Sequence, residues 1–225
     1  MTGLSNAYSV ILKALALHAA IAGPLLAQRV LDRGTLVFSR SGLVVAKEDF
    51  IVQEGRTGGE PGFAILSRVA FPDQPGTGLL PSLELGVDSL PEAYQVIEPP
   101  PGPKVSIEVV PRRITVRTER GARESVREYP VRAPVLLVDD SAFALHAFPP
   151  PGRPGPVVLL WRSGKRERSQ WFDKGIEPTQ LNGMTVRLHH IQLDGPPLRD
   201  LWYDERGRLA KVDIPSLSVS AVRAP

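Results

Sequence analysis

Short segments in which apolar and polar residues alternate recur along the chain, and they constrain its fold more than any other feature. In one of them the residues that share a strand face are mostly apolar: Val44, Ala46, Glu48, Phe50 and Val52. Successive side chains of a strand point to opposite faces, so this face is expected to turn inward, with Glu48 as its polar exception. The same alternation in VSIEVV, RITVRT and RESVREY predicts antiparallel sheet with one face in water.

Turn residues separate these segments throughout. The 225 residues include 23 prolines and 20 glycines, which favours many short elements over long helices. The last three strands read as a meander, with Gly207 in the first turn and Pro215 before the final strand. The expected strands are 34–40, 43–53, 63–71, 80–87, 93–97, 105–110, 113–118, 123–129, 157–162, 168–173, 184–193, 198–203, 208–214 and 218–223.

The segment Val135–Phe148 departs from this pattern. Asp139, Asp140 and Ser141 are good N-cap residues, and the apolar residues after them are compatible with about two turns of helix before Pro149. The predicted fold class is therefore all-β, or β-dominated α+β. We expect one domain over residues 28–225, a strongly curved antiparallel sheet or open half-barrel with one or two short helices.

Residues 1–27 have the organisation of a signal peptide. Lys13 precedes a short apolar run, Gly23-Pro24 breaks it, and Ala27 offers a cleavage point, with Ala22 as the alternative. The run is too short for a typical membrane span. A buried amphipathic helix is the competing interpretation. The favoured prediction is a secreted or periplasmic protein without a transmembrane segment after cleavage.

Charge and cysteine content exclude several classes of function. Lysine and arginine exceed aspartate and glutamate by only 27 to 24, which gives +3 and no nucleic-acid footprint. Because there is no cysteine, the chain has no disulfide, thiolate nucleophile or cysteine-ligated zinc. No P-loop, G-x-S-x-G or H-E-x-x-H motif occurs, and no cofactor is predicted.

Two groups of polar residues have structural explanations. His189 and His190 are adjacent in a strand, so they point to opposite faces; we expect one to be buried and hydrogen-bonded and neither to bind a metal. An arginine-rich pair of strands is interspersed with glutamates, which favours a solvated face with cross-strand ion pairs over an anion-binding surface. Its arginines are Arg112, Arg113, Arg117, Arg120, Arg123 and Arg127.

Aromatic residues are concentrated in the second half of the chain. They are either core residues or the lining of a ligand cavity in the mouth of the curved sheet. The candidate lining residues are Phe143, Phe148, Trp161, Trp171, Trp202 and Tyr203.

Three stretches carry a resemblance to a family of uncharacterised secreted bacterial β-proteins, which is similar to the lipoprotein-carrier fold. They are GTLVFSRSGLVVAKEDFIVQ, PVLLVDDSAFALHAF and LWYDERGRLAKVDIPSLSVSAVR. The resemblance implies a curved sheet around short helices whose inner face holds acyl chains. It transfers no binding residue to this chain.

The resulting expectation is a non-enzymatic protein that binds an apolar or amphiphilic, lipid-like molecule on the concave face of its sheet. One alternative is a structural or protein-interaction module of the cell envelope with a solid core. The other is a hydrolase, which would need convergent polar side chains of perturbed pKa in a cleft.

Overall fold

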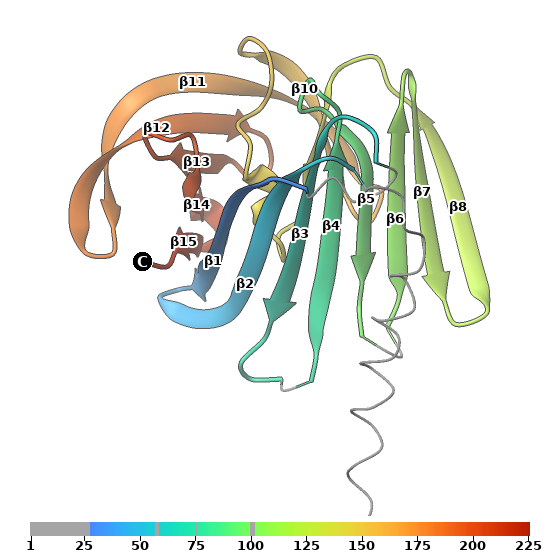
Figure 1. The fold of residues 1–225 in the computed structure, drawn as a ribbon, viewed down its shortest axis with the longest axis horizontal. Coiled ribbons are helices and arrows are strands. Elements are labelled where there is room, and N and C mark those ends of the chain that lie inside the picture. Colours follow the sequence, from blue (N-terminus) through green and yellow to red (C-terminus); the bar gives the residue numbers. More distant parts are fainter. Residues whose placement is uncertain (1–27, 57–58, 75, 100–101) are drawn as a thin grey trace, which may run out of the picture.

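The protein is described by a computed structural model that covers residues 28–56, 59–74, 76–99 and 102–225 (Figure 1). The predicted signal peptide and both of its cleavage points lie outside the described residues. Within the described part, no helix has the length and apolar character needed to cross a membrane.

Strands make up most of the described chain. They are β1 (Val30–Arg40), β2 (Leu43–Glu54), β3 (Phe63–Ala70), β4 (Gly78–Leu85), β5 (Pro91–Ile97), β6 (Lys104–Val110), β7 (Arg113–Arg120), β8 (Arg123–Pro130), β9 (Val135–Val138), β10 (Gly155–Trp161), β11 (Arg166–Leu181), β12 (Met184–Asp194), β13 (Arg199–Tyr203), β14 (Leu209–Ile214) and β15 (Val219–Arg223). Two single 3₁₀ turns, η1 (Ala144–His146) and η2 (Pro215–Leu217), complete the described structure.

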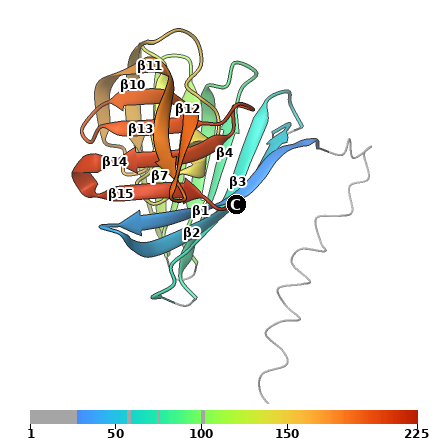
Figure 2. The same ribbon diagram turned by 90° about the vertical axis from the view of Figure 1, so that its left-hand side faces the viewer.

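All 15 strands belong to one sheet. Its order is β8-β7-β6-β5-β4-β3-β2-β1-β15-β14-β13-β12-β11-β10-β9, and every pair of neighbours is antiparallel except β9 and β10. The first and last strands pair in the middle, where Leu36 lies opposite Arg223. Figures 1 and 2 show that the sheet curls strongly and stays open between its two edges, β8 and β9. The predicted all-β curved sheet is confirmed.

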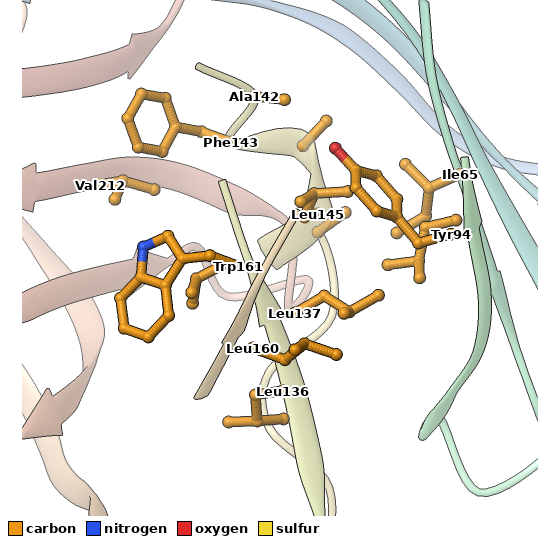
Figure 3. Packing of buried hydrophobic residues seen from close by; sticks show 14 of the residues in the cluster. Ile65, Tyr94, Leu136, Leu137, Ala142, Phe143, Leu145, Leu160, Trp161 and Val212 are labelled. Carbon is orange, nitrogen blue, oxygen red and sulfur yellow. The ribbon is translucent and has the colours of Figure 1, made fainter. Parts of the chain in front are cut away.

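The core lies on the concave side of this curl. The β9 and η1 segments occupy the space between the two halves of the sheet (Figure 1). Figure 3 shows Leu137 and Phe143 from this central segment among side chains from both halves, such as Ile65 and Val212. Removing each such side chain from water contributes about 1.5–3 kcal/mol, so the central segment holds the two halves together.

Burial in β2 follows the predicted alternation with one exception. Glu48 points inward and is fully buried, together with Ala46, Phe50 and Val52. Val44 was expected on this face but is 50% exposed, because it lies beside the β1–β2 turn, where a register shift occurs.

Two local predictions were wrong. The expected two turns of helix after Asp139 are a single 3₁₀ turn, because the N–H groups of Phe143 and Ala144 bond to Glu48 and residues 135–138 pair with β10 as a strand. The strand predicted at 168–173 continues to Leu181, since a bulge at Gly175 (φ +77°) lets β11 bend and keep pairing with β12.

Candidate ligand-binding site

Glu48 joins the sheet to the central segment. Its Oε2 accepts hydrogen bonds from the backbone N–H groups of Phe143 (2.7 Å) and Ala144 (3.0 Å), and its Oε1 accepts one from the Ser67 hydroxyl (2.7 Å). These two N–H groups begin the η1 turn and have no partner within it. The inward carboxyl of β2 therefore caps the turn.

Asp139 and Asp140 connect the same segment to other strands. Asp139 accepts hydrogen bonds from the Tyr94 hydroxyl (3.0 Å) and from the Ser141 backbone N–H (2.9 Å). Asp140 forms an ion pair of 2.5 Å with Arg199, whose side chain is 1% exposed and also donates to the Pro197 carbonyl. The predicted N-cap role was wrong for both: Asp139 bonds within a local turn before η1, and Asp140 binds a cation of β13.

Burial changes the acidity of this cluster. It raises the pKa of Glu48 to about 7, against the hydrogen bonds that lower it, and it raises the pKa values of Asp139 and Tyr94. Each of these groups is bonded to another part of the chain and sealed from water, so none of them is free to meet a substrate. The cluster holds the fold together and does not form the cleft that a hydrolase requires.

His146 is a buried polar side chain of the same central segment. Burial, with the charge of Arg199 nearby, lowers its pKa to about 3, so the ring is neutral at physiological pH. Its Nε2 has no hydrogen-bond partner among the described residues, and its backbone carbonyl accepts a hydrogen bond from the Tyr203 hydroxyl (2.9 Å). The ring lines a cavity of about 30 Å³.

A large opening lies at the end of the curl where β6 turns into β7 and where the chain passes from β8 into β9. It has a volume of about 1110 Å³, slightly above the range of about 300–1,000 Å³ that is typical of small-molecule sites. We call it the upper opening, after its place in Figure 1. Its walls are formed by Asp88, Leu90, Pro91, Glu92, Val109, Val110, Pro111, Arg112, Pro130, Val131, Arg132, Ala133, Pro134 and Val135.

Two smaller cavities adjoin the upper opening. A cavity of about 280 Å³ shares Pro134 with it, and the cavity beside His146 shares Pro91 with it. Both smaller cavities are bounded by Leu136 and by the prolines that follow η1. Proline has a fixed φ angle and no N–H group, so this end of the molecule has stiff, largely apolar walls.

The structure separates the six predicted lining residues. Trp171 lines the cavity of about 280 Å³ and Phe148 lines the one beside His146. Phe143, Trp161 and Tyr203 are buried in the main core and line none of these three cavities. The sixth, Trp202, lies on the other face of the sheet. Sequence reasoning missed the upper opening itself, whose walls are mostly proline, valine and leucine.

The opposite end of the curl has a different character. A cavity of about 660 Å³ lies there between the β3–β4, β5–β6 and β7–β8 connections. At its base Arg162 lies 3.5 Å from the carboxylate of Asp139 and 3.8 Å from that of Glu98. The charge of Arg162 is therefore already engaged by the protein.

A second polar cluster lies on the convex face. The β11–β12 hairpin bends over β13 and β14, and Leu181 and Val186 pack against a small apolar cluster that includes Trp202. Beneath the hairpin the His190 ring stacks on Trp202 and lies 2.8 Å from Glu177 and 2.9 Å from Asp200. His189 lies on the other face, beside Asp173. The predicted opposite orientation of the two histidines is confirmed.

The arginine-rich strands carry the predicted ion pairs. On the outer face of β7 and β8, Arg117 pairs with Glu124, and Arg113 lies 3.9 Å from Glu128. Among the described residues, no group of three or more histidine, aspartate or glutamate side chains is arranged to hold a metal ion.

Searches of protein-family models, curated proteins and solved structures found no match to this chain.

Proposed function

We propose that this protein binds an apolar or amphiphilic, lipid-like molecule at its upper opening and catalyses no reaction. The observation that carries the proposal is the set of three adjoining cavities there, walled mainly by proline, valine and leucine. The middle of the concave face is filled by β9 and η1, which moves the proposed site from that face to its end.

Apolar burial supplies the affinity. An acyl chain gains about 0.8 kcal/mol for each methylene group that leaves water, so a chain that enters only in part is still held. Trp171 would contact its far end in the cavity of about 280 Å³. This proposal retains part of the predicted lining and replaces the rest by residues of the β4–β5, β6–β7 and β8–β9 connections.

A secreted or periplasmic location and kinship with the lipoprotein carriers belong to the same proposal. The organisation of residues 1–27 supports the first. An open, strongly curved sheet around a short helical turn supports the second.

Mass spectrometry of the extracted ligand tests the proposal. Purified wild-type protein is expected to release an apolar or amphiphilic molecule into organic solvent. Ala133→Trp, which places an indole in the upper opening, is expected to release none. The matched control Ala122→Trp lies in the exposed β7–β8 turn and should behave as wild type. Wild-type protein that carries no ligand, and that binds no added amphiphile, would contradict the proposal.

A further inference from the structure

The upper opening combines apolar walls with cations that have no partner. Arg112 and Arg132 both line it and are both exposed. Neither of these arginines forms a hydrogen bond or ion pair through its side chain within the described residues. Arg153, at the neighbouring cavity of about 280 Å³, is likewise exposed and unpaired among them.

The two acids of this opening are already engaged. Glu92 forms an ion pair with Arg56, and Asp88 accepts a hydrogen bond of 3.0 Å from the Leu90 backbone N–H. The cavity at the other end of the curl contains both kinds of arginine: Arg162 lies beside two carboxylates, whereas Arg120 is exposed and has no partner among the described residues. The formal charges of the upper opening balance, since Asp88 and Glu92 line it with Arg112 and Arg132; what sets it apart is that two arginines without a partner in the described part of the chain meet there on apolar walls.

The backbone of Arg112 adopts a strained conformation at this opening. Arg112 has φ +69°, a left-handed conformation that costs a non-glycine residue about 1 kcal/mol. Its carbonyl accepts a hydrogen bond of 3.0 Å from the N–H of Val131, next to Arg132. This bond ties the β6–β7 turn to the β8–β9 connection, so both guanidinium groups belong to one rim.

We propose that the ligand of the upper opening is an amphiphile with an anionic head group, a carboxylate or a phosphate, and that Arg112 and Arg132 bind that group. This inference rests on the proposed function and adds the charge of the ligand to it. The guanidinium geometry suits both oxyanions, which accept two parallel N–H bonds. The apolar tail would then run from the arginine rim along the walls of Leu90 and Val131.

Isothermal titration calorimetry with three dodecyl amphiphiles tests the inference. Dodecanoate, dodecyl maltoside and dodecyltrimethylammonium share one tail and differ in head-group charge, and each is used below its critical micelle concentration. Wild-type protein should bind dodecanoate about tenfold more tightly than the other two, and added salt should reduce this preference. Dodecyl phosphate in place of dodecanoate then distinguishes a phosphate head group from a carboxylate.

Variants that remove the charges of Arg112 and Arg132 test whether these residues cause the preference for dodecanoate. The double variant Arg112→Gln/Arg132→Gln should lose the preference for dodecanoate and keep its affinity for dodecyl maltoside. The control Arg123→Gln, at the other end of β8 and about 20 Å from Pro130, should bind all three as wild type does. Thermal unfolding verifies that each variant is folded.

The outcomes separate the two proposals. Equal binding of the three amphiphiles, or an unchanged preference in the double variant, would overturn the anionic head group and leave the binding site standing. No binding of any amphiphile, or binding that Ala133→Trp does not reduce, would overturn the site itself.

Discussion

The polar cluster around Glu48 on the concave face and the one around His190 on the convex face use similar residue types but distribute their hydrogen bonds differently. Glu48 is fully buried and bonds to two backbone N–H groups that have no other acceptor. His190 bonds to side chains, and one of them, Glu177, is 44% exposed. Water can replace a partner in the second cluster but not in the first. The comparison teaches that burial of the partners, more than the number of bonds, decides what a polar group contributes to stability.

The largest expected effect follows from removing the inner carboxyl. Glu48→Ala leaves the N–H groups of Phe143 and Ala144 buried without an acceptor, and we expect a loss of about 4 kcal/mol in the free energy of unfolding. Urea denaturation followed by tryptophan fluorescence measures it. A loss below about 1 kcal/mol would mean that the central segment finds other acceptors.

A pH dependence of stability is the second expected effect. The pKa of Glu48 is about 7 in the folded protein and close to the ordinary glutamate value of 4.5 in the unfolded chain. Between these values the folded state binds the proton and the unfolded state does not, so the free energy of unfolding falls as the pH rises. The raised pKa stabilises the folded protein by about 3 kcal/mol below pH 4.5, and this stabilisation is lost by about pH 7.

Glu48→Gln isolates this contribution. The glutamine carbonyl can accept the same two N–H bonds, and its amide can donate to Ser67, at every pH. The wild type should therefore lose stability relative to Glu48→Gln as the pH rises from 4.5 to about 7. Denaturation of both proteins across this range measures the difference, and parallel curves would contradict a raised pKa for Glu48.

The smallest expected effect belongs to the convex cluster. Glu177→Ala removes an exposed partner of His190, whose other nitrogen keeps Asp200 and whose ring keeps its stack on Trp202. We expect a loss of about 0.5 kcal/mol, since exposed ion pairs contribute little. The same urea experiment applies. A cost equal to that of Glu48→Ala would remove the distinction between the two faces.

The strands could be predicted well because the alternation of apolar and polar residues is a local pattern that each segment shows by itself. Inward Glu48 and the opposite orientations of His189 and His190 follow from the period of a strand alone. The 3₁₀ turn at Ala144–His146 could not be predicted in this way, because its N–H groups are bound by a residue almost a hundred positions earlier. Tertiary hydrogen bonds replaced the local preference for a longer helix.

The candidate site was harder to predict than the fold. Its walls come from three separate parts of the chain and contain no residue type that marks a function. Arg112 and Arg132 belong to a region that reads as a solvated surface, and only the cavity between them distinguishes these arginines from the paired ones at Arg113 and Arg117.

The order of strands in the sheet has a consequence for how the chain assembles. The two ends of the described chain pair at the centre of the sheet, through β1 and β15, whereas the two free edges, β8 and β9, are consecutive in sequence. A circular permutant that is opened between Arg132 and Val135, with Pro225 joined to Gln28 by a linker that spans about 20 Å, would pass through all the strands in their spatial order. Its central pairing would change from the most distant contact in sequence to a local one, and such a chain should fold faster without any change in its side-chain packing.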